Sequence, residues 1–249
     1  MIGSEQKKPV TGAGGIYQKY IKRFFDIVCA ISAIVAFCWL YAIVAVLVRL
    51  NLGSPVVFKQ PRPGKIDPAT GREKIFNMYK FRTMTDARDV NGELLPDSMR
   101  ITKLGKALRA TSLDELPEAF NILKGDMSVI GPRPQLVRDM VFMSEEQRRR
   151  HIVRPGLSGL AQVNGRNSIT WQEKLDTDLV YIEKITFWGD FKIVCRTVKQ
   201  VFIRKNMTET SSETDLAEDF GDALLESGKI SAEEYEEKQE LAKEILAGA

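Results

Sequence analysis

Cysteine and histidine are scarce in this sequence. It contains three cysteines, Cys29, Cys38 and Cys195, and one histidine, His151. No two cysteines are closely spaced, so the ligand spacing of a zinc site is absent, and a single histidine gives no basis for a cysteine–histidine catalytic dyad. We interpret the cysteines as small buried or lipid-facing thiols in a reducing compartment.

Acidic residues are sparse in the body of the chain and concentrated at its end. Residues 1–206 contain 33 Lys and Arg against 20 Asp and Glu, whereas residues 207–249 contain 3 against 13. A basic body is typical of proteins that bind phosphates or an anionic membrane surface. Zinc-finger spacing, a basic zipper and the aromatic signature of RNA-binding strands are missing, so we do not expect nucleic acid as a partner.

The longest apolar run, residues 27–48, has no charge, no proline and no glycine. As a helix, its 22 residues would extend about 33 Å at ~1.5 Å per residue, roughly the thickness of one hydrocarbon core. The run is too long for the apolar region of a signal peptide, and it lacks a convincing cleavage site. Its default interpretation is one membrane-spanning helix.

The charges around this run favour another topology. Basic residues stand on both sides of it: Lys19, Lys22 and Arg23 before, and Arg49, Lys59, Arg62 and Lys65 after. The positive-inside rule therefore selects no orientation for a spanning helix. Two basic flanks would suit a helix that enters the membrane and returns, but re-entry requires a break, and the run lacks the usual breakers. Both topologies stay open at this point.

The rest of the chain divides into further segments. Residues 1–18 are expected to be a flexible leader. Residues 56–60 and 75–84 are expected to be strands joined by a loop rich in proline and glycine, with Lys80 and Arg82 on one face of the second strand. Residues 101–125 are expected to form helical segments with a break near residues 110–112.

Two adjacent carboxylates, Asp114 and Glu115, follow this break. Pro117 fits the first turn of a helix and Gly125 fits its C-terminal cap. The pair would then lie at or just before a helix N-terminus, where backbone N–H groups and the helix dipole favour a phosphate. Acids are also common in the first turn of ordinary helices, so spacing alone leaves both interpretations open.

Two stiff arginine loops follow the pair. Arg133 lies between two prolines, and Arg154 precedes a proline and a glycine. Because proline fixes φ, each guanidinium leaves a restrained backbone, which suits bidentate phosphate binding; a surface turn with a solvated arginine is the alternative.

The C-terminal part combines an amphipathic segment with an acidic tail. Residues 179–205 interleave aromatic and basic side chains, a pattern of helices that lie in a membrane interface and equally of helices that pack on a core. Residues 207–219 are expected to be a linker. Residues 220–249 are expected to be a helical hairpin, with Ser231 as the N-cap of its second helix.

Six motifs occur in the order and at the spacing of one protein family. They are MYKFRTM at 78–84, SLDELP at 112–117, LKGDMS at 123–128, IGPRP at 130–134, RPG at 154–156 and GLAQVNGRN at 159–167. Over residues 17–205 the chain resembles the bacterial sugar transferases, which are monotopic polyprenyl-phosphate phosphoglycosyl transferases. It is most similar to their minimal catalytic-core form, which starts N-linked glycan assembly with UDP-diacetylbacillosamine, and NGELLP at 91–96 adds to that likeness.

The resemblance implies transfer of a sugar 1-phosphate from a UDP-sugar to polyprenyl phosphate, with release of UMP. Asp114 would be the nucleophile of a ping-pong mechanism with an aspartyl-phosphosugar intermediate, and Glu115 would hold Mg²⁺. The residues implied to bind phosphate or substrate are Lys80, Arg82, Arg109, Arg133, Arg154, Gln162, Asn164, Arg166 and Asp178. Look-alike enzymes use UDP-diacetylbacillosamine, UDP-N-acetylgalactosamine, UDP-galactose or UDP-glucose, so the sugar stays open.

The resemblance also implies a fold and a location. We expect an α/β protein, mostly helical with a small β-hairpin, with a re-entrant membrane helix at 19–52 and a catalytic domain with interfacial helices at 53–206. The catalytic domain would face the cytoplasm at the bacterial inner membrane.

The family commonly places Ser-Pro in the middle of its membrane helix, whereas Cys38-Trp39 stand there in this chain. We favour re-entry because both flanks are basic.

Other functions stay open beside this one. An inactive membrane scaffold would bind UDP-sugar without releasing UMP, and a Mg²⁺-dependent phosphohydrolase would use water as the acceptor.

The tail at 220–249 resembles short C-terminal helical hairpins of other bacterial proteins, which suggests a homodimer or partner docking; a solvated acidic appendage is the alternative.

Overall fold

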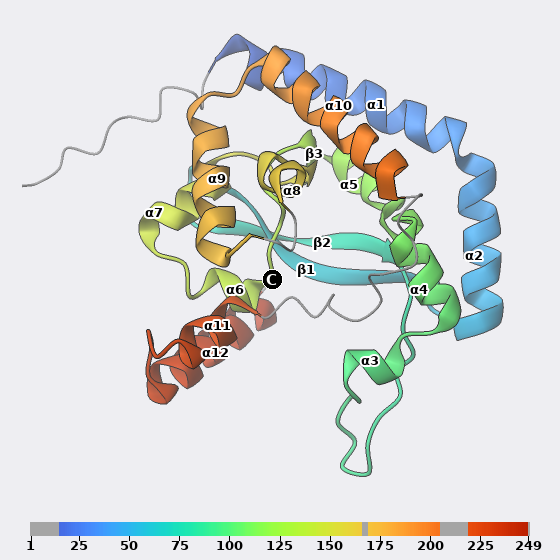
Figure 1. Ribbon diagram of the computed structural model, residues 1–249, viewed down its shortest axis with the longest axis vertical. Coiled ribbons are helices and arrows are strands. Elements are labelled where there is room, and N and C mark those ends of the chain that lie inside the picture. The colour runs from blue at the N-terminus through green and yellow to red at the C-terminus, as the bar shows by residue number, and fades with distance from the viewer. Residues whose placement is uncertain (1–14, 166–168, 205–218, 249) are drawn as a thin grey trace, which may run out of the picture.

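The computed structural model describes residues 15–165, 169–204 and 219–248. These residues form a mostly helical protein with two small two-stranded sheets, which confirms the expected α/β class (Figure 1). Most of the leader expected at 1–18 and of the linker expected at 207–219 lies outside the described residues.

The apolar run forms two helices instead of one. After the π-helical turn η1 (Tyr17–Ile21), helices α1 (Lys22–Ala36) and α2 (Cys38–Leu52) meet at Phe37 with a bend of 64°. No single helix within the described ranges is both long and apolar enough to cross a bilayer, although the bent pair together meets both criteria. The default interpretation of residues 27–48 as one continuous helix is therefore wrong, and the re-entrant topology that we favour stays a prediction.

The bend forms without proline or glycine. Phe37 leaves the helical region at φ −106° and ψ 14°, and the amide of Leu40 bonds the carbonyl of Phe37 at 2.9 Å. In a continuous α-helix this amide would bond the carbonyl of Ala36, four residues earlier. The indole N–H of Trp39 donates to the Ala36 carbonyl instead, at 3.2 Å. A side chain thus satisfies a backbone group that the bend frees.

Polar contacts hold α1 against the rest of the protein. The buried carboxylate of Asp26 accepts hydrogen bonds from the Ser128 hydroxyl at 2.9 Å and from the Val129 amide at 2.8 Å. At the start of α1, the Lys22 ammonium pairs with Asp190 at 2.6 Å. Buried polar groups need hydrogen-bond partners, so these contacts fix the mostly apolar helix α1 at Lys22 and at Asp26.

Helix α2 packs on the same body of the protein. Its buried Val44 and Val48 join a hydrophobic cluster with Phe81 and Leu108. The Tyr41 hydroxyl donates to the Leu116 carbonyl at 2.5 Å. Both legs of the bent pair therefore contact one domain.

A β-hairpin forms the larger sheet. Strands β1 (Val57–Ile66) and β2 (Glu73–Phe81) pair antiparallel, and Lys80 lies opposite Phe58. The two expected strands are confirmed, and β1 runs further than expected. A register shift near Gly64 marks a bulge at the far end of the hairpin.

The region expected to be helical at 101–125 is broken where the sequence predicts. The short helix α3 (Asp97–Arg100) precedes this region. The region itself contains α4 (Lys103–Ala110), the 3₁₀ turn η2 (Leu113–Glu115) and α5 (Glu118–Lys124). Gly125, at φ 92°, takes the left-handed conformation that ends α5, as expected.

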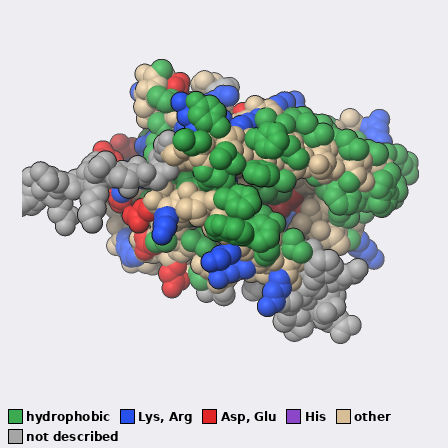
Figure 2. Space-filling view, turned by 90° about the horizontal axis from the view of Figure 1, so that it is seen from above, with side chains coloured by type: hydrophobic (Ala, Val, Ile, Leu, Met, Phe, Trp, Pro, Cys, Tyr) green, Lys and Arg blue, Asp and Glu red, His purple; other side chains and the backbone are tan. Residues whose placement is uncertain are grey.

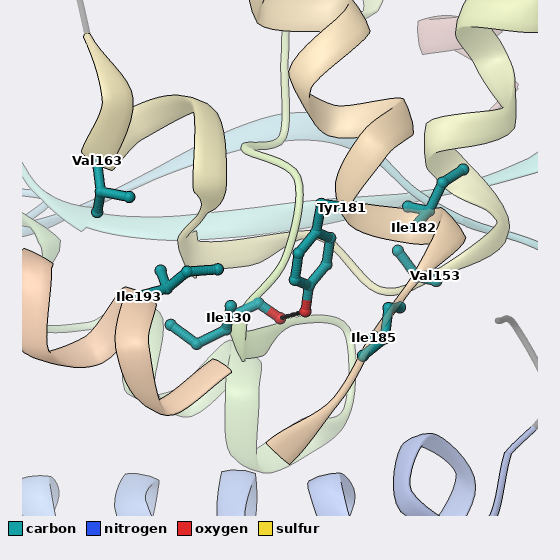
Figure 3. Close-up of a cluster of buried hydrophobic side chains, with 7 residues drawn as sticks. All are labelled: Ile130, Val153, Val163, Tyr181, Ile182, Ile185 and Ile193. Carbon is teal, nitrogen blue, oxygen red and sulfur yellow. Dashed lines mark hydrogen bonds between the residues drawn. The ribbon is translucent and has the colours of Figure 1, made fainter. Parts of the chain in front are cut away.

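A second sheet and its helices complete the domain. The elements are β3 (Ser128–Ile130), α6 (Val137–Met140), α7 (Glu145–Arg148), η3 (Arg149–Ile152), β4 (Gly156–Ser158), α8 (Leu160–Asn164), α9 (Trp171–Glu183) and α10 (Phe187–Arg204). β3 and β4 pair parallel. Tyr181 packs among aliphatic side chains of these elements, and its hydroxyl donates to the Ile130 carbonyl at 3.3 Å (Figure 3).

The acidic tail packs on its own chain. Helices α11 (Phe220–Glu226) and α12 (Ala232–Ala247) lie against α6, at the opposite end of the molecule from α1 and α10 (Figure 1). The Phe220 amide donates to the buried Asp139 at 3.0 Å, and Tyr235 stacks on Phe142. The predicted cap is confirmed, because the Ser231 hydroxyl accepts the Glu234 amide at 3.1 Å.

One face of the molecule is strongly apolar. Figure 2 views the side that carries α1 and α10 and shows hydrophobic side chains gathered across it. The exposed side chains of α1, α2 and α10 include Phe24, Val35, Trp39, Leu50, Trp188 and Phe191. Helix α10 also buries Ile193 in the core, which bears out core packing for that face of the helix. The interfacial interpretation of its exposed face stays a prediction.

Candidate active site

The acidic pair lies on a tight turn between α4 and α5. Ser112 adopts the left-handed conformation, with φ 56°, and directs the chain into η2. Asp114 is 7% exposed and forms no ion pair with another described residue. Burial and the charge of Glu115 raise the pKa of Asp114, while the charges of Lys80 and Arg109 oppose this shift. The turn therefore holds a buried carboxylate that, among the residues the structure describes, is near cations but not ion-paired with one.

Glu115 lies between two cations. Its Oε1 is 2.9 Å from Lys80 Nζ and 3.2 Å from an Arg133 guanidinium nitrogen. Burial alone would raise the pKa of Glu115, but the charges of Arg133 and Lys80 outweigh it and hold the pKa well below its usual range. Glu115 is therefore ionised at neutral pH, as a metal ligand must be.

A third carboxylate, which the sequence analysis missed, completes this cluster. Glu118, in the first turn of α5, is buried and lies 3.3 Å from Lys80 Nζ. Burial raises the pKa of Glu118 to about 7 despite the opposing charge of Lys80. Its position three residues after Glu115 was the available signal, because this spacing brings side chains to the same side of a helical turn.

A buried amide aligns the turn with the strand that carries Lys80. The Asn121 side chain, fully buried in α5, donates to the Asn77 carbonyl at 2.7 Å and accepts the Tyr79 amide at 2.9 Å. Both partners lie on β2, and Tyr79 directly precedes Lys80. Asn121 therefore fixes α5, and with it the acidic pair, relative to the Lys80 ammonium.

The loop that carries Arg133 is braced from behind. An Arg150 guanidinium nitrogen donates to the Arg133 carbonyl at 2.6 Å, and Arg62 donates to the Pro134 carbonyl at 3.0 Å. A Cβ on Gly131 would come within 2.5 Å of the Arg154 carbonyl oxygen, so only glycine fits there without displacement. The expected stiffness of this loop thus comes from its partners as well as from its prolines.

Asp178 belongs to this bracing and lies apart from the pair. It is 2% exposed and pairs with the buried Arg150 at 2.5 Å. Through Arg150 it reaches the backbone of Arg133. The structure therefore gives Asp178 the contacts of a positioning residue. The substrate contact that the resemblance implied stays a prediction.

The other implied site residues divide into two groups. Arg109 approaches the pair, and its Nε donates to the Thr83 hydroxyl at 3.2 Å. Arg82 is occupied elsewhere, because it pairs with Asp86 and donates to the Leu52 and Ser54 carbonyls.

The implied nucleotide segment lies beyond the far end of α5. Arg154 donates through Nε to the Gly125 carbonyl at 2.8 Å. Gln162 donates to the Leu157 carbonyl at 3.3 Å, and Asn164 accepts from Arg196 at 3.2 Å. Arg166 lies outside the described residues.

The donor set of the pair suits a hard cation in part. Asp114 and Glu115 offer adjacent carboxylate oxygens, the ligands that Mg²⁺ prefers. Within the described ranges, no group of three or more potential metal-ligating side chains forms a complete site. A Mg²⁺ ion would therefore need phosphate oxygens and water to complete its coordination, which is common for this ion.

Comparison with known proteins gives one family. The sequence model of the family described as "Bacterial sugar transferase" matches residues 17–204. EpsL of Bacillus subtilis (strain 168), described as an uncharacterized sugar transferase, is 45% identical over 78% of this chain and 93% of its own length.

Two further relatives carry the names of specific transferases. The galactosyl transferase CpsE of Streptococcus agalactiae serotype III is 40% identical over 73% of this chain and 42% of its own length. The UDP-N-acetylgalactosamine-undecaprenyl-phosphate N-acetylgalactosaminephosphotransferase of Aeromonas hydrophila is 38% identical over 73% of this chain and 44% of its own length. The chain therefore spans less than half the length of these two relatives.

The buried brace gives a test that separates positioning from substrate contact. We predict that Asp178→Asn lowers the free energy of unfolding by about 3–5 kcal/mol, because it leaves the buried Arg150 charge without its partner. Chemical unfolding in detergent, followed by tryptophan fluorescence, measures this change. The exposed Asp176 on the same helix provides the control, and Asp176→Asn should change stability by less than about 0.5 kcal/mol. Unchanged stability of Asp178→Asn, with weaker binding of the nucleotide sugar, would contradict the positioning role.

Proposed function

The chain belongs to the bacterial sugar transferase family, and we propose that it transfers a sugar 1-phosphate from a UDP-sugar to polyprenyl phosphate. UMP leaves, and a polyprenyl-diphospho-sugar is the product. The observation that carries this proposal is Asp114: a buried carboxylate with no ion-pair partner among the described residues, beside a second carboxylate held by two cations. The names of the relatives support the reaction class, since one of them is a sugar-phosphate transferase that acts on undecaprenyl phosphate.

Asp114 is the proposed nucleophile. One of its carboxylate oxygens attacks the phosphorus that bears the sugar, and the bond from that phosphorus to the oxygen bridging it to UMP breaks. UMP leaves with the bridging oxygen and its electron pair. A phosphate oxygen of the polyprenyl acceptor then attacks the same phosphorus and displaces Asp114. Dividing the substitution into two steps lets one site serve a soluble donor and a lipid acceptor in turn.

The cations around the pair stabilise the charge that develops at phosphorus. Arg133 and Lys80 already lie within about 3 Å of Glu115, so a phosphate placed at the pair meets donors held in position before it arrives. Arg109 adds positive charge beside Asp114. Glu115 would hold Mg²⁺ together with phosphate oxygens, and the ion would neutralise phosphate charge. The part of the implied nucleotide segment that follows Arg154, residues 155–167, would bind the nucleotide.

The bent helix pair supports a re-entrant membrane attachment. Lys22 at the start of α1 pairs with Asp190, and Arg82 holds the Leu52 carbonyl at the end of α2, so both ends of the pair are fixed to the same domain. The Trp39 indole satisfies the carbonyl that the bend frees, which a break inside lipid requires. The exposed apolar side chains of α1, α2 and α10 would enter the cytoplasmic leaflet of the inner membrane, with the catalytic domain in the cytoplasm.

The reaction is tested by UMP release across a panel of UDP-sugars. We predict Mg²⁺-dependent UMP release for at least one of UDP-diacetylbacillosamine, UDP-N-acetylgalactosamine, UDP-galactose and UDP-glucose, with a polyprenyl-diphospho-sugar as product. Asp114→Asn should reduce the rate roughly a thousandfold or more, as loss of a nucleophile does, while Asp97→Asn, at an exposed carboxylate, should retain it.

The products distinguish the transferase from its alternatives. Free sugar phosphate without a lipid product would indicate a phosphohydrolase. Binding of UDP-sugar without UMP release would indicate an inactive scaffold. Normal turnover by Asp114→Asn would show that another group is the nucleophile.

The membrane topology is tested by labelling in intact cells. In a background with Cys29, Cys38 and Cys195 replaced by serine, we predict that Ser4→Cys does not react with a membrane-impermeant maleimide until the membrane is permeabilised, because re-entry keeps the N-terminus in the cytoplasm. Reaction after permeabilisation is the control that the thiol is accessible. Labelling in intact cells would contradict the re-entrant topology and favour a spanning one.

A further inference from the structure

A cationic cavity lies apart from the acidic pair. It has a volume of about 240 Å³ and is lined by residues of η1, α1, the end of β1 and the loop before β4, with Lys19, Lys22, Lys65 and Arg154 as its cations. A water molecule occupies about 30 Å³ of liquid volume, so the cavity has room for a phosphate group with several waters.

The positive charges of this cavity exceed the negative ones. Lys22 is paired with Asp190, and the carboxylate of Asp26 is bound by Ser128 and Val129. Lys19 and Lys65 form no ion pair with the described part of the chain. The Lys19 ammonium lies over the Tyr20 ring, 5.3 Å from its centroid. The cavity therefore offers two ammonium groups that have no carboxylate partner among the described residues.

The guanidinium of Arg154 adds unused donors. Its Nε bonds the Gly125 carbonyl, and its two terminal nitrogens have no hydrogen-bond partner within the described ranges. Arg23 lies nearby, and burial together with the charge of Arg154 lowers the pKa of Arg23. Asp26 is the carboxylate in the cavity lining, and its charge partly opposes the lowering of the Arg23 pKa. The four cations of the lining outnumber this carboxylate, which is the arrangement expected of an anion site.

The cavity and the acidic pair lie at opposite ends of α5. Glu118 begins this helix beside the pair, and Gly125, bound by Arg154, follows its last residue. Seven helical residues extend roughly 10 Å at ~1.5 Å per residue. A phosphate in the cavity would therefore lie too far away to react with Asp114.

The cavity borders the apolar face. Tyr20 and Phe24, within about one helical turn of Lys19 and Lys22, are 62% and 63% exposed. Tyr17 contacts Phe187 at 6.2 Å between ring centroids, and Phe187 leads to the exposed Trp188 of α10. An anion in the cavity would thus have exposed aromatic and aliphatic side chains beside it, which suit acyl chains.

We propose that this cavity binds the phosphate headgroup of an anionic membrane lipid, with its acyl chains along the exposed side chains of α1 and α10. The proposal rests on the membrane attachment inferred above, and it deepens that attachment by assigning a discrete lipid site. Lys19, Lys65 and the free nitrogens of Arg154 hold the phosphate. The bound lipid fixes the height of α1 in the leaflet, close to the domain that carries the acidic pair.

Native mass spectrometry of the full-length protein in detergent tests this site with phosphatidylglycerol as the probe. The wild type should retain one phosphatidylglycerol, and Lys19→Gln/Lys65→Gln should bind it roughly thirtyfold more weakly, at about fivefold for each lysine. Lys65→Gln alone should weaken binding about fivefold. The matched control is Lys229→Gln/Lys243→Gln, which removes two exposed lysines from the tail and should bind like the wild type.

Three further arms distinguish the sources of the phosphate. Neither UDP nor inorganic phosphate at millimolar concentration should displace the lipid, and the double variant should release UMP at the wild-type rate in detergent.

Displacement by UDP would make the cavity part of the nucleotide site and overturn the proposal, as would unchanged lipid retention by the double variant. Displacement by polyprenyl phosphate at equimolar concentration would assign the cavity to the acceptor and equally overturn it. A protein that releases UMP but retains no lipid refutes the lipid site alone, so this failure is separate from a failure of the proposed reaction.

Discussion

The contact of Glu115 with Lys80 and Arg133 is the interaction on which the site depends. The two cations come from different elements, one from a strand and one from a loop, and both contact the same oxygen of Glu115. Each of these elements is held by groups that do not touch the pair. Asn121 fixes the acidic turn to β2 through two backbone hydrogen bonds. Arg150, neutralised by Asp178, fixes the Arg133 backbone. This arrangement leaves Asp114 as the carboxylate of the pair that is buried and has no ion-pair partner in the described part of the chain, which suits a nucleophile.

Polar contacts also fix the membrane side of the molecule, where the buried or half-buried polar groups of α1 are paired with groups of the catalytic domain. Asp26 gives α1 its fixed position, because its buried carboxylate bonds both the side chain of Ser128 and the backbone of Val129. Strand β3, which carries Ser128 and Val129, leads directly into the Arg133 loop. The helix that we place in the leaflet therefore contacts the chain a few residues before the loop to which we assign phosphate binding. The acidic tail docks on α6 at the opposite end, which keeps its negative charge away from the surface that we assign to an anionic membrane.

Local patterns in the sequence predicted much of this structure. The two strands, the break before the acidic pair, the glycine that ends α5 and the serine cap of α12 all depend on neighbouring residues, and all are confirmed. The bend at Phe37 was not predictable from proline or glycine, because the apolar run contains neither. The bend instead depends on the Trp39 indole, which donates to the Ala36 carbonyl that loses its backbone partner. Sequence spacing could not assign the roles of Asn121, Arg150 and Asp178, because these roles depend on contacts between residues that are far apart in the chain. Asn121 bonds the backbone of β2, and Arg150 bonds both Asp178, 28 positions away, and the backbone of the Arg133 loop. The approach of Lys80 to the pair was anticipated only through the family resemblance.

The central claim is that Asp114 carries the phosphosugar between donor and acceptor. The most direct measurement is the intact mass of the folded protein after incubation with its UDP-sugar and Mg²⁺ in the absence of polyprenyl phosphate. The account predicts one equivalent of UMP per chain and a mass increase of one sugar phosphate, located on Asp114 by peptide mapping and lost on addition of the acceptor. UMP release only when both substrates are present, with no adduct at any time, would contradict it.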